Sequence, residues 1–535
     1  MHRTTTVRRR IAHTLTEPIV YLIGAGPGNP ELITVRGQQC LAEADVVIYD
    51  HLVHPRILQF ARASAEKIDV GMPAPLPNDQ EAICYLLSEK AREGQVVARL
   101  KWGDPFIFDS GGSEALFLHE QRIRFEVIPG IPAAIGAASY AGVPLTYPGG
   151  GDTLTFVRGN EGAADSLPDV DWSSLATLDG TIVCYAGPAQ LPAMLQALLK
   201  AGRPADDTAA LIYDGTLPTQ QTTVGALEEI ARAVQDNTDR RPAILVIGRV
   251  AALRENLRWY DDRPLFGKRV LVTRPREQAA EFVNLLQKLG ATPIEAPMIR
   301  IAPPSDYAPM DEACANLQQF DWAVFTSGNA VDSFMNRLLA SSADVRALNS
   351  VKLCAIGAGT AEHFTRFGIK VDLTPPESRA ESVLLALLES GDVRGVRFLL
   401  PRADIGREVI GEELRKRGAI VTDVIAYRTV AIEPEHDTDL DVYRMLLDRR
   451  IDIVTFTSPS SVRSFAELYG ADAAADLLHT TSVAAIGPVT AEAAAQLGIE
   501  CSIVPSHYTI EALCAAIVKH VEGVEGAVAS QAPVR

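Results

Sequence analysis

Short apolar runs alternate with glycine-bearing turns and helix-spaced segments along this chain, beginning at residue 19. An apolar run at 20–23 enters a glycine-rich turn, segment 32–44 has helical spacing, and segment 45–50 has the pattern of a second strand. Further apolar runs that meet a glycine or a proline lie at 96–100, 125–128, 153–157, 181–185 and 244–247. This order of strand, turn and helix predicts an α/β fold.

A polar junction at 261–264, ending in Pro264, marks the main change of composition along the chain. We therefore expect two domains, 17–262 and 266–522, flanked by a basic tail at 1–16 and a second tail at 523–535. The first 13 residues carry four arginines and no acid, which is typical of an untethered basic terminus.

The second domain repeats itself at an interval near 130 residues. R-V-L-V-T-R (269–274) is similar to R-F-L-L-P-R (397–402), and V-F-T-S-G-N-A-V (324–331) to T-F-T-S-P-S-S-V (455–462). A-I-G-A-G-T-A-E (355–362) is similar to A-I-G-P-V-T-A-E (485–492). The period is too long for a solenoid, so it indicates a duplicated α/β unit whose two lobes enclose a cleft.

Two proline-bearing segments predict where the chain crosses between these lobes. Pro303-Pro304 and segment 432–436 follow two equivalent apolar strands. We expect lobe one to comprise 266–302 plus 431–522, and lobe two to comprise 303–430.

Composition excludes several classes of protein. A hydrophobic fraction of 47% with 22% charged residues is typical of a globular chain, and the net charge of −17 argues against nucleic-acid or membrane-surface binding. No apolar run approaches the roughly 18 residues of a membrane helix. Seven dispersed cysteines indicate reduced thiols in a cytoplasmic protein without a metal site.

The glycine loop at 24–30 is the first candidate binding element. Glycines at 24, 26 and 28 permit a tight turn and close approach to a ligand. The usual dinucleotide fingerprint places its third glycine one position later, and no Gly-Lys-Ser/Thr phosphate motif follows. From these residues alone, a structural turn and a nucleotide-like ligand site both stay open.

The motifs around this loop resemble those of the tetrapyrrole methylase family, in its uroporphyrinogen-III C-methyltransferase branch. The resemblance rests on segments spanning 19 to about 258 in family order: V-Y-L-I-G-A-G-P-G-N-P-E-L-I-T-V-R-G (20–37), A-D-V-V-I-Y-D-H-L-V (44–53), G-D-P-F-I-F (103–108), V-I-P-G-I-P-A-A-I-G-A-A-S-Y-A-G-V-P-L-T (127–146), D-G-T-L-P-T-Q-Q (214–221) and P-A-I-L-V-I-G-R-V (242–250). It implies two α/β lobes that hold S-adenosylmethionine between them, usually within a homodimer.

The resemblance also implies site residues. Asp50 matches the family's proton acceptor, a role that suits a carboxylate because a proton must leave when a pyrrole carbon is methylated. By itself Asp50 reads equally as a helix cap or a solvated acid. The positions matching cofactor contacts are Pro27, Trp102, Gly103, Asp104, Ile107, Pro132, Ala133, Ala186 and Gly215.

This chain departs from the family's pattern within these motifs. The positions are Met72, where the family has a lysine proposed as proton donor, and Trp102, Asp109, Ser110, Pro132, Tyr147 and Ala186. Trp102 stands where the family has glycine, so its indole is expected to fill part of the cofactor pocket.

Residues 266 to about 520 resemble uroporphyrinogen-III synthases, in which two similar α/β lobes face each other across a cleft. The segments that carry this resemblance are 269–279, 325–331, 399–408, V-I-A-Y-R-T (424–429), 455–462 and 484–492. The reaction it implies is cyclisation of linear hydroxymethylbilane with inversion of the last ring, which needs no metal or cofactor and depends mainly on positioning.

Tyr427 matches the family tyrosine that assists departure of the hydroxyl group, since a phenol donates a hydrogen bond; alone, it reads as a half-buried strand residue. The substrate-binding candidates at turns facing the cleft are Thr326, Ser327, Asn329, Thr360, Ser458, Ser460 and Thr490. Both I-G-x-x-T turns present a helix N-terminus that suits a carboxylate, with ordinary N-capping as the alternative. Arginines near strand ends suit the substrate's carboxylates: Arg274, Arg276, Arg402 and Arg407.

The leading hypothesis is therefore a bifunctional tetrapyrrole enzyme of the sirohaem or cobalamin branch. One half makes uroporphyrinogen III, and the other methylates it to precorrin-2 with S-adenosylmethionine. Two alternatives stay open at this point: a chain in which only the synthase half is active beside a degenerate methylase half, and a tetrapyrrole-binding protein without turnover.

Overall fold

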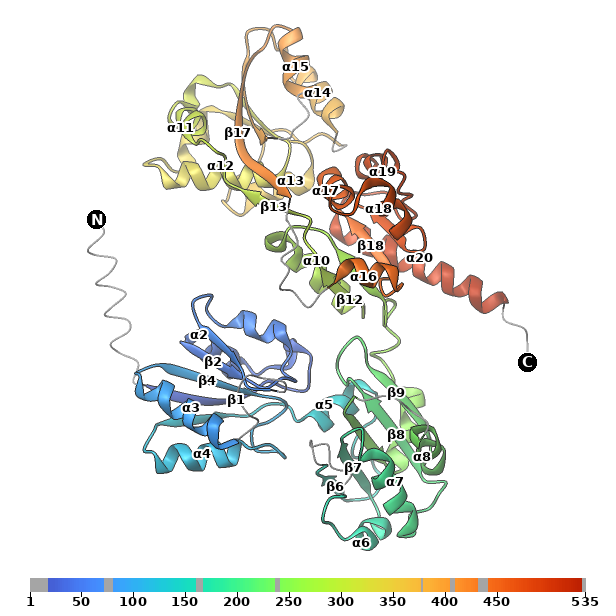
Figure 1. The fold of residues 1–535 in the computed structure, drawn as a ribbon. Coiled ribbons are helices and arrows are strands. Elements are labelled where there is room, and N and C mark those ends of the chain that lie inside the picture. The colour runs from blue at the N-terminus through green and yellow to red at the C-terminus, as the bar shows by residue number, and fades with distance from the viewer. Residues whose placement is uncertain are drawn as a thin grey trace. The chain divides into compact units, whose positions relative to one another are not determined.

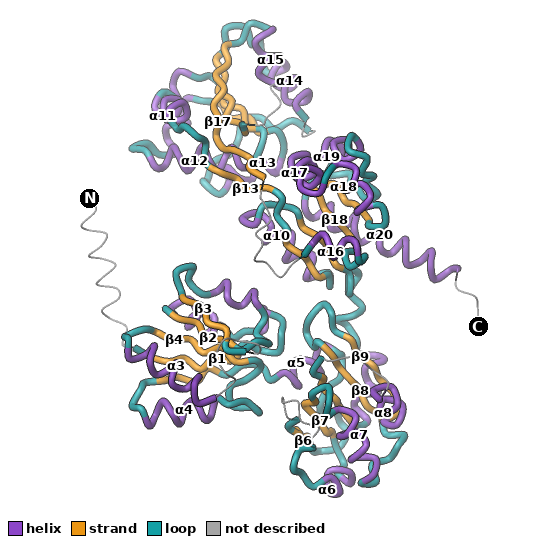
Figure 2. Tube along the Cα trace, in the orientation of Figure 1, coloured by secondary structure: helices purple, strands orange, loops and turns teal. Residues whose placement is uncertain are grey.

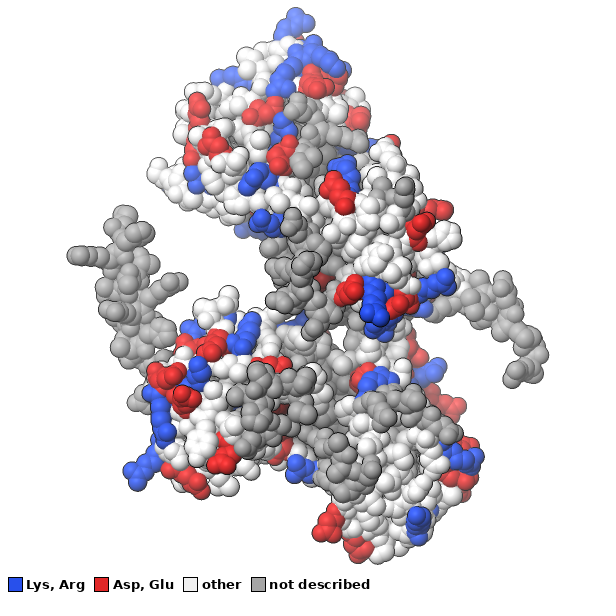
Figure 3. Space-filling view, viewed as in Figure 1, with Lys and Arg blue, Asp and Glu red and all other residues white. Residues whose placement is uncertain are grey.

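The computed structural model describes residues 18–71, 80–159, 167–235, 241–376, 379–404, 409–431 and 441–531. The chain divides between Gly267 and Lys268 into two compact units, a few residues after the junction at 261–264 (Figure 1). No helix within the described ranges is long and apolar enough to cross a membrane. Charges of both signs are interspersed on the face seen in Figure 3.

The first unit begins with a sheet of five parallel strands in the order β3-β2-β4-β1-β5 (Figure 2). Its strands are β1 (Ile19–Gly24), β2 (Val46–Tyr49), β3 (Glu66–Asp69), β4 (Val96–Lys101) and β5 (Phe125–Ile128). The helices of this lobe are α2 (Val35–Glu43), α3 (Gln80–Arg92) and α4 (Gly111–Glu120).

Both faces of the inner strand β1 are buried, which explains why this strand is apolar throughout rather than alternating. Successive residues of β1 point to opposite faces. Tyr21 and Ile23 pack in the core that contains residues of α2, whereas Val20 and Leu22 pack in the core that contains residues of α3 and α4.

The helix predicted at 32–44 begins later, at Val35. The Thr34 hydroxyl caps α2 by accepting a hydrogen bond from Gly37 N at 3.0 Å. Before it, Pro30–Leu32 forms a short 3-10 helix capped by Asn29. The polar caps therefore override the apolar spacing that extended the prediction to residue 32.

The second sheet of the first unit has the order β6-β7-β10-β8-β9. Strands β6 and β7 are parallel, whereas β10 runs antiparallel to both β7 and β8. Its strands are β6 (Leu154–Val157), β7 (Thr181–Ala186), β8 (Thr208–Tyr213), β9 (Gln221–Ala226) and β10 (Ala243–Ile247). The helices are α5 (Ala133–Tyr140), α6 (Trp172–Thr177), α7 (Leu191–Lys200), α8 (Leu227–Gln235) and α9 (Arg254–Leu257).

The second unit also contains two sheets. The third sheet of the molecule, with order β12-β11-β18-β19, comprises β11 (Arg269–Val272), β12 (Thr292–Glu295), β18 (Ile453–Phe456) and β19 (Ser482–Ala485). Its helices are α10 (Arg276–Lys288), α16 (Val442–Leu447), α17 (Pro459–Tyr469), α18 (Ala471–Leu478), α19 (Pro488–Ala495) and α20 (Ile510–Gln531).

The fourth sheet has the order β13-β17-β16-β14-β15. Its strands are β13 (Ile299–Ala302), β14 (Trp322–Phe325), β15 (Lys352–Ala355), β16 (Arg397–Ala403) and β17 (Ile420–Ala431). Its helices are α11 (Ala308–Ala315), α12 (Gly328–Ala340), α13 (Ala358–Thr365), α14 (Ala380–Glu389) and α15 (Val409–Lys416).

The crossing point predicted at about 302 lies earlier in the structure, whereas β17 ends at Ala431, beside the other predicted crossing. β13 pairs antiparallel with the end of β17, from Ile299 opposite Ala431 to Ala302 opposite Arg428. β17 extends beyond β16, whose pairing ends at Tyr427, and β13 pairs with this extension. The chain therefore leaves the third sheet before Ile299, and 299–302 belongs to lobe two rather than lobe one.

The tail predicted at 523–535 is also incorrect over most of its length, because α20 continues to Gln531. The segment is rich in alanine and contains no proline before residue 533, so nothing in it stops the helix. The basic segment 1–16 lies outside the described residues.

Candidate active sites

Three glycine loops meet at the carboxyl edge of the first sheet, and their backbones touch. A Cβ at Gly24 would lie 2.4 Å from Gly130 N, and a Cβ at Gly130 would lie 2.2 Å from Gly103 O. Gly26 and Gly103 exchange two backbone hydrogen bonds, at 3.1 and 2.9 Å. The loops form a backbone-lined wall at the strand ends where open α/β sheets bind ligands.

Asp104 holds two of these loops together. Its Oδ1 accepts from Phe106 N at 2.8 Å, and its Oδ2 accepts from Gly130 N at 3.0 Å. Sequence reasoning placed Asp104 among the cofactor contacts, and the structure shows that both carboxylate oxygens already fix the loop backbone.

Helix α5 is the point where loops from both sheets of the first unit converge. A Cβ at Gly136 would lie 2.5 Å from Pro27 Cγ, so the proline ring packs directly on the helix. A Cβ at Gly215 would lie 2.3 Å from Ala137 Cβ. The structure thus brings Pro27 and Gly215, far apart in sequence, against one helix.

The amino end of α5 holds the next pair of candidates. Pro132 is its N-cap and buried Ala133 is its first residue. Ala134 N donates to the Tyr185 hydroxyl at 3.3 Å, which links the helix to the end of β7, where Ala186 is buried. Five of the nine predicted cofactor positions therefore lie at or beside α5: Pro27, Gly103, Pro132, Ala133 and Gly215.

Three other predicted positions are more open. Trp102 is half-buried beside Gly103, and Ile107 is 43% exposed. Tyr147 is exposed, whereas Met72 lies outside the described residues.

Asp50 follows β2 at this same edge, and its carboxylate forms ion pairs with buried cations. Arg99 Nη2 lies 2.5 Å from Asp50 Oδ1, and Lys101 Nζ lies 3.9 Å from Asp50 Oδ2. Glu114 Oε1 accepts from both Arg99 Nε and Lys101 Nζ at 3.1 Å. The side chains of Arg99, Lys101 and Glu114 are at most 1% exposed, whereas Asp50 is 27% exposed and reachable.

Two further groups bind the same lysine. Asp109 Oδ1 lies 2.9 Å from Lys101 Nζ, and Ser110 Oγ lies at 3.0 Å. Burial raises the pKa of Asp109, while Lys101 acts in the opposite direction. Burial also acts to raise the pKa of Glu114, but Arg99 and Lys101 outweigh it, and the pKa of Glu114 is lowered.

Sequence reasoning missed Arg99, Lys101 and Glu114. The available signal was two cations at alternate positions of an apolar strand, because residues two apart share a face of a strand. The strand was interpreted only as an apolar run, and the partner acids come from segments distant in sequence.

The second unit presents matching helix N-termini after β14 and β18. Ser327 caps α12 with φ −159° and ψ 153°, and Ser458 caps α17 with φ −158° and ψ 154°. Each Oγ accepts from the N–H three residues further on at 3.2 Å. Gly357 and Gly487 precede α13 and α19 with similarly matched, extended angles. The duplication predicted from sequence is confirmed at the level of backbone geometry.

Tyr427 lies with two of the substrate-binding candidates. Its buried hydroxyl is 3.1 Å from Ser327 Oγ and also bonds the Asn329 side chain. Asn329 Oδ1 in turn accepts from Gln278 of α10. Burial raises the pKa of Tyr427, and the bonds from Ser327 and Asn329 act against that shift.

The remaining threonines and serines are placed differently. Thr360 and Thr490 are the third residues of α13 and α19 and are buried, so their hydroxyls are neither N-caps nor open groups. No side chain caps either helix. Thr326 is exposed and Ser460 half-buried.

The candidate arginines also separate into different environments. Arg402 lies 3.5 Å from Asp423 and donates to Ala403 O at 3.3 Å. Arg274 is half-buried at the end of β11, where burial lowers its pKa and Glu281 acts against that shift. The Arg276 side chain and Arg407 lie outside the described part of the chain.

A histidine–aspartate pair beside Ser327 was not anticipated. His363 Nδ1 lies 2.9 Å from Asp332 Oδ2, and a Cβ at Gly328 would lie 2.3 Å from His363 Nε2. No sequence signal links these residues, because they belong to separate helices.

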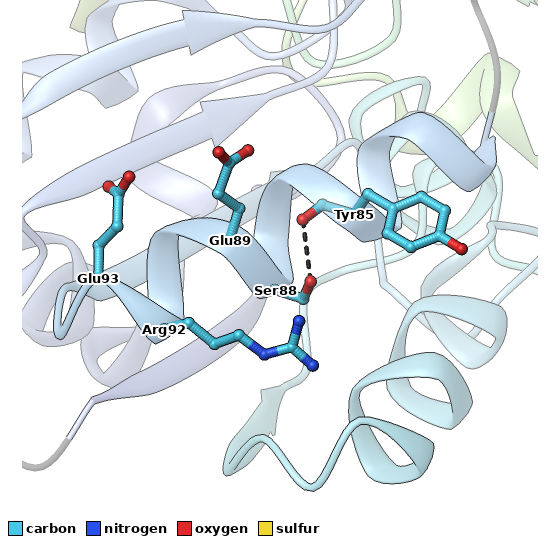
Figure 4. Close-up of a pocket in the computed structure, with 5 residues that line it drawn as sticks. All are labelled: Tyr85, Ser88, Glu89, Arg92 and Glu93. Carbon is cyan, nitrogen blue, oxygen red and sulfur yellow. Dashed lines mark hydrogen bonds between the residues drawn. The ribbon is translucent and has the colours of Figure 1, made fainter.

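Figure 4 shows a hollow on α3, lined by Tyr85, Ser88, Glu89, Arg92 and Glu93. The Ser88 hydroxyl donates a hydrogen bond to Tyr85 O at 3.0 Å, and Arg92 Nη2 donates to Gln121 Oε1. Four of these residues lie on α3 and Glu93 follows its last residue, and none of the five is a candidate from the sequence.

Comparison with known proteins matches each unit to a different family. The model for Tetrapyrrole (Corrin/Porphyrin) Methylases matches residues 19–231, and that for Uroporphyrinogen-III synthase HemD matches residues 280–515. These matches define a protein of tetrapyrrole synthesis with a methylase unit and a synthase unit.

Relatives extend this match across the junction. The chain is 35% identical over 501 residues to "Porphyrin biosynthesis protein HemD" of Ruminiclostridium josui, covering 92% of this chain and 96% of that protein. It is 34% identical over 371 residues to "Uroporphyrinogen-III C-methyltransferase" of Bacillus subtilis (strain 168), covering 68% and 75%. It is 40% identical over 294 residues to "Siroheme synthase" of Thiobacillus denitrificans, covering 54% and 56%. The chain belongs to the family of porphyrin-biosynthesis proteins that join a tetrapyrrole methylase to a uroporphyrinogen-III synthase.

Proposed function

We propose that the second unit cyclises hydroxymethylbilane to uroporphyrinogen III, and that the first unit methylates this product to precorrin-2. The observation that carries the proposal is the position of Asp50: a reachable carboxylate on a buried arginine, at the glycine-lined edge of the methylase-matched unit. The similarity to a siroheme synthase supports the sirohaem branch as the destination of the product.

The loops of the first unit suit S-adenosylmethionine. Gly24 and Gly130 have no room for a side chain, and Gly103 has a φ of +70° that favours glycine. Backbone amides and carbonyls therefore line this edge and can hold an adenine and a methionyl carboxylate. Further contacts would come from Pro132, Ala133 and Gly215 around α5. Bound there, S-adenosylmethionine supplies an electrophilic methyl group.

Asp50 completes the methylation. Addition of a methyl group to a pyrrole carbon leaves one positive charge on the macrocycle. Asp50 removes this charge by taking a proton from another position of the macrocycle, whose bonding electron pair stays in the ring system. The carboxylate is exposed enough to meet substrate and is oriented by Arg99.

In the second unit, Tyr427 assists departure of the bilane hydroxyl. The phenol donates a hydrogen bond to the leaving oxygen, the C–O bond breaks, and water departs with the pyrrole N–H proton. Ser327 and Asn329 hold the phenol in place. Closure through a spiro intermediate then depends on how the substrate is folded, which is a positioning effect.

Carboxylate groups of the substrate require cations and helix N-termini in this unit. We assign them to Arg274, a half-buried cation at the end of β11, and to the first turns of α13 and α19, which have no side-chain cap. Ser458 and Ser460 supply hydroxyls from the duplicate lobe.

An assay of the purified chain tests both activities. Hydroxymethylbilane alone should give uroporphyrinogen III, and addition of S-adenosylmethionine should give a dimethylated product by mass spectrometry. Cyclisation without methylation would leave only the synthase active, and loss of both activities in folded protein would overturn the proposal.

We also propose a cytoplasmic homodimer formed through the methylase unit. The family resemblance supports the dimer, and the free, mostly buried cysteines support a reducing compartment. Light scattering of the full chain and of variants of the methylase unit tests the assembly.

A further inference from the structure

The carboxylate that faces the substrate rests on charged side chains that the proposed mechanism does not otherwise use. We propose that Arg99, fixed by Glu114, is the positioning residue that keeps the Asp50 carboxylate oriented, and that Asp109 competes with Asp50 for Lys101. This inference rests on the proposed methylase function.

Arg99 has little freedom to adopt another arrangement. Its Nη2 lies 2.5 Å from Asp50 Oδ1, its Nε 3.1 Å from Glu114 Oε1, and its Nη1 donates to Leu100 O at 3.2 Å. The three contacts occupy three sides of a planar guanidinium that is 1% exposed. A cation held in this way presents one fixed edge to Asp50.

Glu114 is the counter-ion for the buried cations. Its Oε1 accepts from Arg99, Lys101 and Gln80, each at 3.1 Å. Its Oε2 is buried and has no hydrogen-bond partner within the described ranges. Because all of these bonds converge on one oxygen, loss of Arg99 would leave a buried carboxylate with weaker compensation.

Two cations, Arg99 and Lys101, form ion pairs with three carboxylates in this cluster. Lys101 lies closer to Asp109 than to Asp50. Lys101 Nζ lies 2.9 Å from Asp109 and 3.9 Å from Asp50. Asp50 therefore depends mainly on Arg99, because Asp109 occupies the nearer side of Lys101.

Other ionisable groups around Asp50 come from neighbouring elements. His51 follows it in the chain, Tyr49 and Asp69 lie on β2 and β3, and buried Cys84 on α3 couples to the cluster. Among the described residues, Arg99 and Lys101 are the cations that form ion pairs with Asp50.

The test compares Arg99→Met, Arg99→Lys and Asp109→Asn in the full chain. Arg203→Met is the matched control, because Arg203 is also buried and ion-paired, to Asp207, but in the second sheet's lobe. Methylation rate is measured against pH, with S-adenosylmethionine affinity by calorimetry and bilane cyclisation as internal checks. Difference infrared spectra against Asp50→Asn follow protonation of Asp50 without turnover.

We expect Arg99→Met to move the acid limb of the rate profile upward by about one to two pH units, and to slow methylation about 10- to 100-fold at neutral pH. Arg99→Lys should restore part of the loss, and Asp109→Asn should move the limb downward. Arg203→Met should lower the melting temperature and leave the limb in place.

A uniform loss of rate with an unmoved profile in Arg99→Met would make Arg99 merely structural and overturn the inference. If Arg99→Met does not fold, Arg99→Lys and Asp109→Asn decide, because each is a small change of shape. If the wild-type chain does not methylate, the proposed function fails. The infrared titration of the Asp50 carboxylate, compared between wild type and Arg99→Met, then decides by itself whether Arg99 acts on Asp50.

Discussion

Replacement of Tyr427 by phenylalanine tests the synthase site most directly, because it removes one hydroxyl and keeps the ring. The ring is part of the buried core that includes residues of α11 and α12. The hydroxyl's two partners keep other bonds in the variant: Ser327 Oγ still accepts from Ala330 N, and Asn329 still accepts from Gln278. No buried polar group is orphaned.

The expected stability loss is therefore small, about 0.5–1 kcal/mol, or roughly 1–4 °C in melting temperature for a unit of this size. The rate effect should be larger. If the hydroxyl assists the leaving group, cyclisation slows about 10- to 1000-fold, which corresponds to about 1.4–4 kcal/mol of barrier.

Product analysis is the sharpest assay, because unassisted bilane closes to the uninverted isomer. We expect Tyr427→Phe to raise isomer I relative to isomer III. Ser327→Ala removes a cap and a Tyr427 contact and should cost about 1 kcal/mol. A raised proportion of isomer I in this variant as well would support the contact between Ser327 and Tyr427. A wild-type rate and ratio in Tyr427→Phe would remove this tyrosine from the mechanism.

Three further outcomes follow from the two units. Asp50→Asn should abolish methylation and leave cyclisation intact, since the two sites lie in separate compact units; coupled loss in folded protein would contradict that independence. Trp102→Gly should strengthen S-adenosylmethionine binding by calorimetry, and unchanged affinity would show that the indole points away from the cofactor. Burial raises the pKa of Cys184 to about 12 and of Cys501 to about 11, so thiolate is scarce at pH 8. Thiol titration should therefore be slow in native protein and increase with pH, starting at half-buried Cys501, and rapid reaction of Cys184 would refute the burial.

Local patterns predicted most of the elements because their causes are local. The strand at 96–101, for example, is flanked by helices on both faces, and its apolar run identifies it without knowledge of its neighbours. The duplication was equally visible, since matched caps at Ser327 and Ser458 need matched sequences. The crossing before Ile299 was missed because it depends on how far β17 extends beyond β16, which is a property of pairing.

The site was predictable only in part, for the same reason. Asp50 was found through its motif, but its electrostatic environment comes from β4 and α4, and no local pattern joins Arg99 to Glu114 across that distance. Thr360 and Thr490 were placed at the correct helix ends, yet whether a first-turn hydroxyl is buried or open depends on the sheet behind it. Chemistry that arises from non-local contacts requires the fold.

The two repeats of the second unit differ at the position of Tyr427. Aligned on R-V-L-V-T-R and R-F-L-L-P-R, Tyr427 corresponds to Ile299, and the equivalent strands around them pair antiparallel with one another. Both repeats therefore keep the serine caps and glycine turns that suit carboxylates, while Ile299 has no hydroxyl at the position equivalent to Tyr427, although both residues lie in the fourth sheet. Hydroxymethylbilane carries a hydroxyl at one end only. A phenol present in one repeat alone is consistent with that requirement, so Ile299→Tyr should leave the cyclisation rate unchanged when it is measured beside the wild-type chain.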